Sequence, residues 1–214
     1  MISGASCQSK DNTTNQQRAL KAQQTITPIE IATIDGLDRA YFASGCFWCV
    51  EAIYESLKGV KESISGYSGG HTQNPTYASS NTGRTGHAEA VEIIYNAQEI
   101  RFSDLVDVYF GSQNIEQVNG QGPDRGSQYR SIIFYQNQAQ KDIIDSKIKE
   151  LEQTLGKGNL AAQVLPFEKF WPGESYHQNY ERLHPNNPYI QNVSIPRLRK
   201  FQKKFPDLLK TKKH

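Results

Sequence analysis

The sequence predicts an α+β fold, a two-layer sandwich of a sheet and the helices that pack on it. Apolar segments with the two-residue repeat of strands and segments with helical spacing follow one another in the order strand-helix-strand-strand-helix-strand. With 214 residues, 36% of them hydrophobic, the chain is long enough for one domain with a sizeable core. It contains no run of about 18 apolar residues, so no membrane-spanning helix is expected in it.

The ordered part is expected to begin near Arg39 with a short buried strand. Ala40 to Ala43 is an apolar run that ends in a Ser-Gly turn. The segment from Phe47 to Lys58 has apolar residues at helical spacing and charged residues on the other face, which predicts a helix. Val60 to Tyr67 is predicted as the second strand, and a long polar loop follows it.

The second half of the chain continues the alternation. Residues 88–95 predict a third strand, and a helix is expected from a cap at Ser103 to Phe110. A Gly-rich loop precedes a strand predicted at 129–135. Residues 138–155 predict an amphipathic helix, and 161–165 a last strand. This order is typical of the ferredoxin-like, split βαβ sandwich.

A long C-terminal coil and a terminal helix are expected after the last strand. Residues 197–214 contain eight Lys or Arg and one Asp, although the whole chain has a formal net charge of only +2. A basic amphipathic helix can contact a membrane or a nucleic acid. Because Leu198, Phe201 and Phe205 form one apolar stripe, we instead expect it to pack on the domain. The near-neutral total also argues against a nucleic-acid-binding protein.

Residues 1–38 are expected to form a disordered polar tail. The part from Ser9 to Thr25 is rich in Gln, Asn, Thr and Lys and offers almost nothing to bury. Cys7 follows small residues and precedes this polar segment, so the tail is either the remnant of a lipoprotein tether or an unrelated sequence. A protein that starts at Met1 is expected in the cytoplasm. Lipidation of Cys7 in a longer precursor would instead make it a periplasmic lipoprotein tethered to a membrane.

Two cysteines lie where the first strand turns into the first helix. At the helix start, free N–H groups and the helix dipole are expected to lower the thiol pKa of Cys46. Cys49 is close enough to form a disulfide with it. Two inert buried cysteines and half of a zinc site are alternatives, but no further ligands have suitable spacing, so no metal is expected. The spacing alone also fits a general CxxC thiol-disulfide oxidoreductase.

An acidic residue is expected on an apolar face of the sheet. Strand alternation puts Glu89 on the same face as Val91 and Ile93, where desolvation would raise the carboxyl pKa and let it donate a proton near neutral pH. The Gly-rich loop presents Asp124 and Tyr129 at the start of the next strand. Such side chains can hydrogen-bond a polar substrate oxygen or orient a nucleophile.

These residues lie in motifs that resemble those of the peptide methionine sulfoxide reductase A family. The matching segments, in the family's order, are GCFW (45–48), YSGG (67–70), NPTY (74–77), GHAEAV (86–91), GSQYRS (126–131) and YHQNY (176–180). They span about residues 39–190, and residues 39–214 are expected to form the catalytic domain.

The resemblance implies a role for each matching side chain. Cys46 would attack the sulfur of methionine S-sulfoxide, become a sulfenic acid and release methionine. Glu89 would protonate the sulfoxide oxygen, helped by the hydroxyls of Tyr77 and Tyr129. The substrates would be oxidised proteins and peptides or free methionine sulfoxide. No cofactor is implied, because external thiols such as thioredoxin or dithiothreitol supply the electrons.

The resemblance also covers substrate binding and recycling. Phe47 and Trp48 would enclose the S-methyl group, and Asp124 would belong to the network that positions the reacting groups and lowers the Cys46 pKa. The chain departs from the usual family pattern at Cys49, commonly glycine, and it has no later cysteine. We therefore expect Cys49 to resolve the sulfenic acid as a Cys46–Cys49 disulfide that thioredoxin reduces. Direct reduction of the sulfenic acid by an external thiol is the alternative.

Methionine, which like cysteine has an oxidisable sulfur, occurs only at Met1. A protein that works where methionine is oxidised would keep its core free of that lesion by using Leu, Ile, Val and Phe. Two readings from other classes remain open at this stage: the general CxxC exchanger, which needs no buried acid, and a non-catalytic peptide-binding module.

Overall fold

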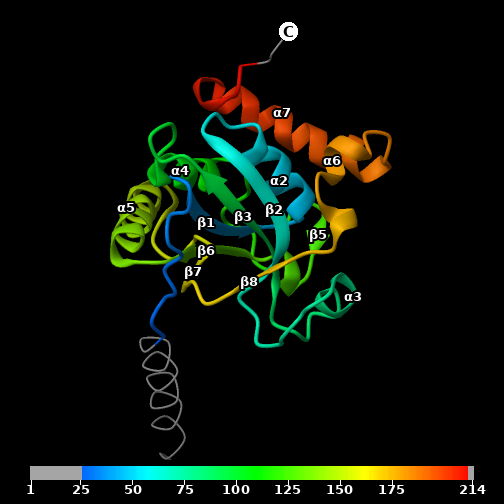
Figure 1. The fold of residues 1–214 in the computed structure, drawn as a ribbon, viewed down its shortest axis with the longest axis horizontal. Helices are drawn as coiled ribbons and strands as arrows, with labels where there is room; N and C mark the ends of the chain where they lie inside the picture. The colour runs from blue at the N-terminus through cyan, green and yellow to red at the C-terminus, as the bar shows by residue number, and fades with distance from the viewer. Residues whose placement is uncertain (1–25, 212–214) are drawn as a thin grey trace, which may run out of the picture.

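The computed structural model describes residues 26–211, which form a sheet with helices around it (Figure 1). The main sheet has six strands in the order β7-β6-β1-β3-β2-β8. Its strands are β1 (Asp38–Ser44), β2 (Val60–Ser68), β3 (Ala88–Tyr95), β6 (Ser131–Tyr135), β7 (Gln163–Pro166) and β8 (Phe170–Pro172). A separate two-stranded ribbon pairs β4 (Gly120–Gln121) with β5 (Asp124–Arg125).

The longer helices are α2 (Phe47–Glu55), α4 (Phe102–Gly111), α5 (Gln138–Leu155) and α7 (Ile195–Lys204). Single turns make up the rest: α3 (Tyr77–Ser80), α6 (Tyr180–Leu183), η1 (Ser127–Tyr129), η2 (Ser175–His177), the π-helical η3 (Ile190–Ser194) and η4 (Pro206–Leu208). Between residues 26 and 211, none of the helices combines the length and the apolar character needed to cross a membrane.

The predicted α+β class is confirmed. β3 pairs antiparallel with both β1 and β2 and lies between them, so it splits the β1-α2-β2 unit. β6 pairs antiparallel with the other edge of β1. Two further strands lengthen the sheet beyond the predicted motif, because β7 adds parallel to β6 and the unpredicted β8 adds antiparallel to β2.

Several predicted boundaries are confirmed and others are wrong. β3 and α5 have the predicted ends. Ser103 does not cap α4: the helix starts at Phe102, because the Asp104 carboxylate accepts the Arg101 amide at 3.0 Å and pairs with its guanidinium at 2.7 Å. The strand expected from Tyr129 starts at Ser131, since the residues before it form the η1 turn.

The larger core lies on the face of the sheet that α2 and α4 cover. Phe42 of β1 packs there against the rings of Tyr54 and Tyr109, with centroids 5.5 and 5.3 Å apart. The opposite face carries a smaller cluster in which Tyr41 stacks on Phe167 at 3.8 Å. Consequently, side chains of β3 that point toward α2 are removed from water.

Both ends of the described chain pack on the domain. α7 lies beside α2 (Figure 1), with Phe201 buried and Leu198 and Phe205 partly buried against the core, so the predicted packing of the terminal helix is confirmed. Within the predicted tail, the amides of Ile29 and Ile31 donate to the Phe167 carbonyl at 2.7 Å and to Gln136 Oε1 at 3.0 Å. Cys7 lies outside the described residues.

Candidate active site

The turn from β1 into α2 places Cys46 and Cys49 together. Cys46 is the N-cap residue of α2 and Cys49 lies in its first turn. The preceding Gly45 has a φ of 85°, and a Cβ there would come within 2.5 Å of Gln121 Cβ, so the turn requires glycine. The cysteine side chains are 5% and 2% exposed, and both are free thiols.

Glu89 of β3 reaches the start of the same helix. Its side chain is only 2% exposed, and Oε2 accepts a hydrogen bond from the Phe47 amide at 3.0 Å. Burial raises the pKa of the Glu89 carboxyl to about 8, which outweighs the opposing effect of this hydrogen bond. The predicted acid on the apolar face is therefore in place, and it is mostly protonated near neutral pH.

The two thiols do not titrate as expected. Burial raises the pKa of the Cys46 thiol well above its ordinary value, and neighbouring Cys49 and Glu89 raise it further. A hydrogen bond from Cys46 lowers the pKa of Cys49 to about 7, and the positive charge of Arg197 also lowers it. The prediction of a lowered Cys46 pKa is wrong for the resting pair, because desolvation and the neighbouring Cys49 and Glu89 outweigh the one lowering contact, with Tyr189. The thiolate instead lies on Cys49.

Tyr77 and Tyr129 flank the carboxyl and the thiols. Tyr77 begins α3, where its amide donates to Glu174 Oε1 at 2.9 Å, and Tyr129 ends η1. Burial raises the pKa of both phenols, and the nearby Glu89 and Cys46 raise them further. Both hydroxyls therefore stay protonated and can donate to an oxygen bound near Cys46.

Phe47 and Trp48 form an aromatic wall with residues of the C-terminal coil. The buried Phe47 ring lies 4.8 Å from the His177 ring and 6.3 Å from that of Tyr77. Trp48 Nε1 donates to His177 Nδ1 at 3.1 Å, and its indole stacks on Tyr180 at 3.8 Å with an interplanar angle of 8°. Such a wall suits a methyl group on a polarisable sulfur.

Asp124 connects to the cysteines through a residue that was not predicted. Its Oδ2 accepts a hydrogen bond of 2.6 Å from the Tyr189 hydroxyl, and that hydroxyl lies 3.8 Å from Cys49 Sγ. The Tyr189 hydroxyl also lowers the pKa of Cys46. The structure thus brings Asp124 toward the thiols indirectly.

Sequence reasoning missed the contributions of the C-terminal coil and helix. The resemblance assigns no role to His177, and the sequence places Arg197 only in the helix expected to pack on the domain. Tyr189 follows an Asn-Pro pair, a turn similar to the one before Tyr77, and this was the available signal. Each of these three side chains reaches the site through a long-range contact, and no strand or helix repeat predicts such a contact.

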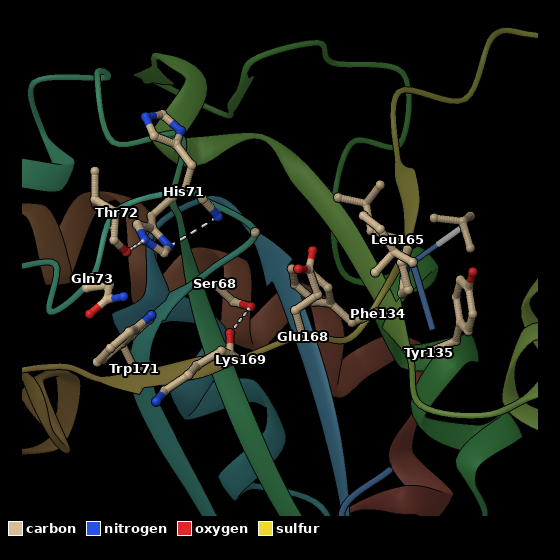
Figure 2. Close-up of a pocket in the computed structure, with 16 residues that line it drawn as sticks. Ser68, His71, Thr72, Gln73, Phe134, Tyr135, Leu165, Glu168, Lys169 and Trp171 are labelled. Carbon is tan, nitrogen blue, oxygen red and sulfur yellow. Dashed lines mark hydrogen bonds between the residues drawn. The ribbon is translucent and has the colours of Figure 1, made fainter. Parts of the chain in front are cut away.

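A separate cavity of about 550 Å³ is lined by residues of β2 and β8 and by residues of β6 and β7, and it contains none of the predicted site residues. Figure 2 shows Ser68, Lys169 and Trp171 around it, with the Ser68 hydroxyl donating to the Lys169 carbonyl at 2.7 Å. Within residues 26–211, no group of three or more His, Cys, Asp and Glu side chains is arranged to hold a metal ion.

The assembled thiols, buried carboxyl and aromatic wall fit the family that the motifs resemble. A match to that family's sequence profile shows the membership. The sequence profile of the family described as peptide methionine sulfoxide reductase matches residues 38–209. The chain belongs to this family. It is 43% identical over 172 residues to peptide methionine sulfoxide reductase MsrA of Pasteurella multocida, covering 80% of this chain and 98% of the relative. It is also 41% identical to MsrA of Saccharolobus solfataricus, covering 85% and 98%.

Solved structures agree with this membership. Methionine sulfoxide reductase A of Corynebacterium diphtheriae superposes with a TM-score of 0.64 at 28% identity, covering 74% of this chain and 82% of that one. Reduced Mxr1 of Saccharomyces cerevisiae gives a TM-score of 0.66 at 30% identity, covering 73% and 91%. The chain is an oxidoreductase of this family that reduces methionine sulfoxide at the expense of thiols, and general CxxC exchange is not favoured.

Proposed function

We propose that this reductase acts on the S epimer of methionine sulfoxide, with Cys46 as nucleophile and Glu89 as proton donor. The observation that carries the proposal is the Glu89 carboxyl, buried and held against the start of α2 by the Phe47 amide at 3.0 Å. A protonated carboxyl beside a thiol is what oxygen transfer from sulfur requires, because the departing oxygen must be protonated.

The first step transfers oxygen and forms methionine. The Cys46 sulfur attacks the sulfoxide sulfur while Glu89 protonates the oxygen, with Tyr77 and Tyr129 as further donors. The products are methionine and the Cys46 sulfenic acid, so the substrate gains two electrons from the thiol. The hydrogen bond from Cys46 to the Cys49 thiolate gives the Cys46 proton an acceptor. Phe47 and Trp48 would hold the S-methyl group.

The second step restores the thiols. The Cys49 thiol attacks the Cys46 sulfenic acid, which forms a Cys46–Cys49 disulfide and releases water. Thioredoxin, or dithiothreitol in its place, then returns two electrons to the disulfide. The cycle needs no metal or organic cofactor, since thiols supply every electron. Direct reduction of the sulfenic acid by an external thiol is the competing route.

A single turnover without reductant tests the cycle. Peptide mapping by mass spectrometry after this turnover should find a Cys46–Cys49 link, and its absence would reject the resolving role of Cys49. Cys49→Ser should keep the first turnover and slow repeated turnover with thioredoxin. Cys46→Ser should abolish both. The S epimer should be consumed and the R epimer left, and consumption of both would reject the stereochemical part.

A further inference from the structure

A cavity reaches Cys49 from the side of α7. This cavity, of about 840 Å³, is lined by residues of α4, the β4–β5 ribbon, η3 and α7, and Cys49 forms part of its wall. Of the side chains assigned to the sulfoxide reaction besides Cys49, only Asp124 lines it, and the following do not: Cys46, Phe47, Trp48, Tyr77, Glu89 and Tyr129. Cys49 therefore faces a space separate from the sulfoxide site.

The cavity carries positive charge that no acid of the described chain pairs with directly. Arg197 and Lys200 line it, and neither forms an ion pair within residues 26–211. The Arg197 guanidinium donates only to neutral oxygens, the carbonyls of Ser44 and Ser112, both at 3.0 Å, and the Ser44 hydroxyl at 3.3 Å. Lys200 is exposed at the rim.

One carboxylate, Asp124, also lines the cavity, but the Tyr189 hydroxyl donates to it at 2.6 Å. The sulfoxide side is acidic by comparison, because the carboxylate of Glu174 accepts a hydrogen bond from the Tyr77 amide there at 2.9 Å. A small anionic reductant is therefore attracted to the α7 side of the thiols and repelled from the other side.

We propose that this cavity admits a small thiol that carries a carboxylate, and that the thiol reduces the disulfide by attacking Cys49. The proposal rests on the Cys46–Cys49 disulfide of the proposed function. Arg197 and Lys200 would attract the carboxylate, and the thiol sulfur would meet Cys49 in the cavity wall.

The electrons balance with two thiols. The first thiolate attacks the Cys49 sulfur, so that the Cys46–Cys49 bond breaks, a mixed disulfide forms on Cys49, and Cys46 leaves as a thiolate. The mixed disulfide carries no charge on Cys49, which removes one of the neighbours that raise the Cys46 pKa, and the buried Cys46 takes up a proton after it leaves. A second thiolate attacks the sulfur of the bound thiol, which releases a small disulfide and the Cys49 thiolate.

The experiment compares two small thiols that differ in charge. Protein oxidised by one sulfoxide turnover is first mapped for the Cys46–Cys49 link, so that a failure of the proposed function shows at this stage. Its reduction is then followed with 3-mercaptopropionate and with neutral 2-mercaptoethanol, each rate being corrected for thiolate concentration. Lys200→Glu should lower the ratio of the two rates about tenfold at low salt, because repulsion replaces attraction.

Lys203→Glu is the matched control, with the same change of charge on α7 outside the cavity lining. It should leave the ratio near the wild-type value, and added salt should reduce the effect of Lys200→Glu. An unchanged ratio in Lys200→Glu, or equal changes in both variants, would overturn the proposal. A Val193→Trp variant, which fills the cavity, should slow both thiols while the first sulfoxide turnover persists; unimpeded reduction would also overturn it.

Discussion

The backbone amide of Phe47 donates a hydrogen bond of 3.0 Å to Oε2 of Glu89. This contact joins the carboxyl of a central strand to the residue that follows Cys46, so the acid and the nucleophile are positioned by one bond. Because the amide occupies Oε2 as an acceptor, the carboxyl proton is left to Oε1. The pair thereby fixes which oxygen donates.

The rate of the first turnover should fall as the pH rises through about 8, the pKa to which burial raises the Glu89 carboxyl. Above that pH the acid has lost its proton. Single-turnover rates across neutral and alkaline pH check this. Glu89→Gln should reduce the rate by about 10²–10⁴-fold and remove the alkaline decline. Glu92→Gln, on the opposite face of β3, is the control and should keep the decline; a pH-independent wild type would contradict the assignment.

Glu89→Gln should also stabilise the fold. The carboxyl pKa is 4.5 in a solvated chain and about 8 in the folded protein, so below about 4.5 both states are protonated and no difference arises. As the pH rises from there to about 8, the unfolded state loses its proton first and the wild type loses stability. Near pH 7 the variant should gain about 3 kcal/mol, because about 2.5 pH units separate pH 7 from the pKa of the solvated carboxyl. Urea unfolding of reduced protein at several pH values measures this, and a gain that does not grow with pH would contradict it.

Tyr189→Phe should make the cysteine pair less reactive. The phenol lies 3.8 Å from Cys49 Sγ and donates to Asp124 at 2.6 Å, so its removal takes a polar neighbour from the thiolate. We expect the pKa of Cys49 to rise by about 1, which lowers alkylation near neutral pH several-fold. Iodoacetamide labelling against pH, with the labelled cysteine identified by mass spectrometry, tests this. Tyr180→Phe keeps the stacking on Trp48 and should behave as wild type; equal slowing in both would argue against Tyr189.

Peroxide should damage this protein only at its cysteines and Met1 among its sulfur residues, because methionine occurs nowhere else. Apart from Ala40 and the two cysteines, the buried side chains around α2 and α4 are Leu, Ile, Val and aromatic residues, which do not form sulfoxides. A low dose followed by dithiothreitol should restore full activity and an unchanged circular dichroism spectrum. Irreversible loss of the fold at a dose that oxidises methionine in a reference protein would contradict this explanation.

The parts of the molecule with a regular repeat could be predicted from the sequence. Alternation along 88–95 put Glu89 on the buried face of β3, where the structure places it. The Gly-Cys turn between β1 and α2 was likewise visible, because a strand repeat changes there to a helical one. The α4 start was misplaced since Ser103 and Asp104 are both good capping residues, and only the contact with Arg101 decides between them.

The remaining site residues depend on contacts that no local pattern carries. β8 is short, ends in Pro172 and follows a coil, so it lacks the alternation that marks a strand. Tyr189 and Arg197 reach the cysteines from the C-terminal coil and α7. The prediction of a lowered Cys46 pKa is wrong for a related reason. The helix N-terminus is visible in the local sequence, whereas the burial that raises the pKa comes from the whole fold.

The indole of Trp48 is held by His177, 129 positions further along the chain, and the turn at Ser44 is held by Arg197, 153 positions further. A chain emerging from the ribosome therefore displays both cysteines long before the segments that enclose them exist. Until then they are ordinary thiols, open to any oxidant or disulfide in their surroundings. Selectivity for sulfoxides is acquired only after His177 and Arg197 have been synthesised, so a product truncated before them would be a promiscuous thiol carrier rather than a weakened reductase.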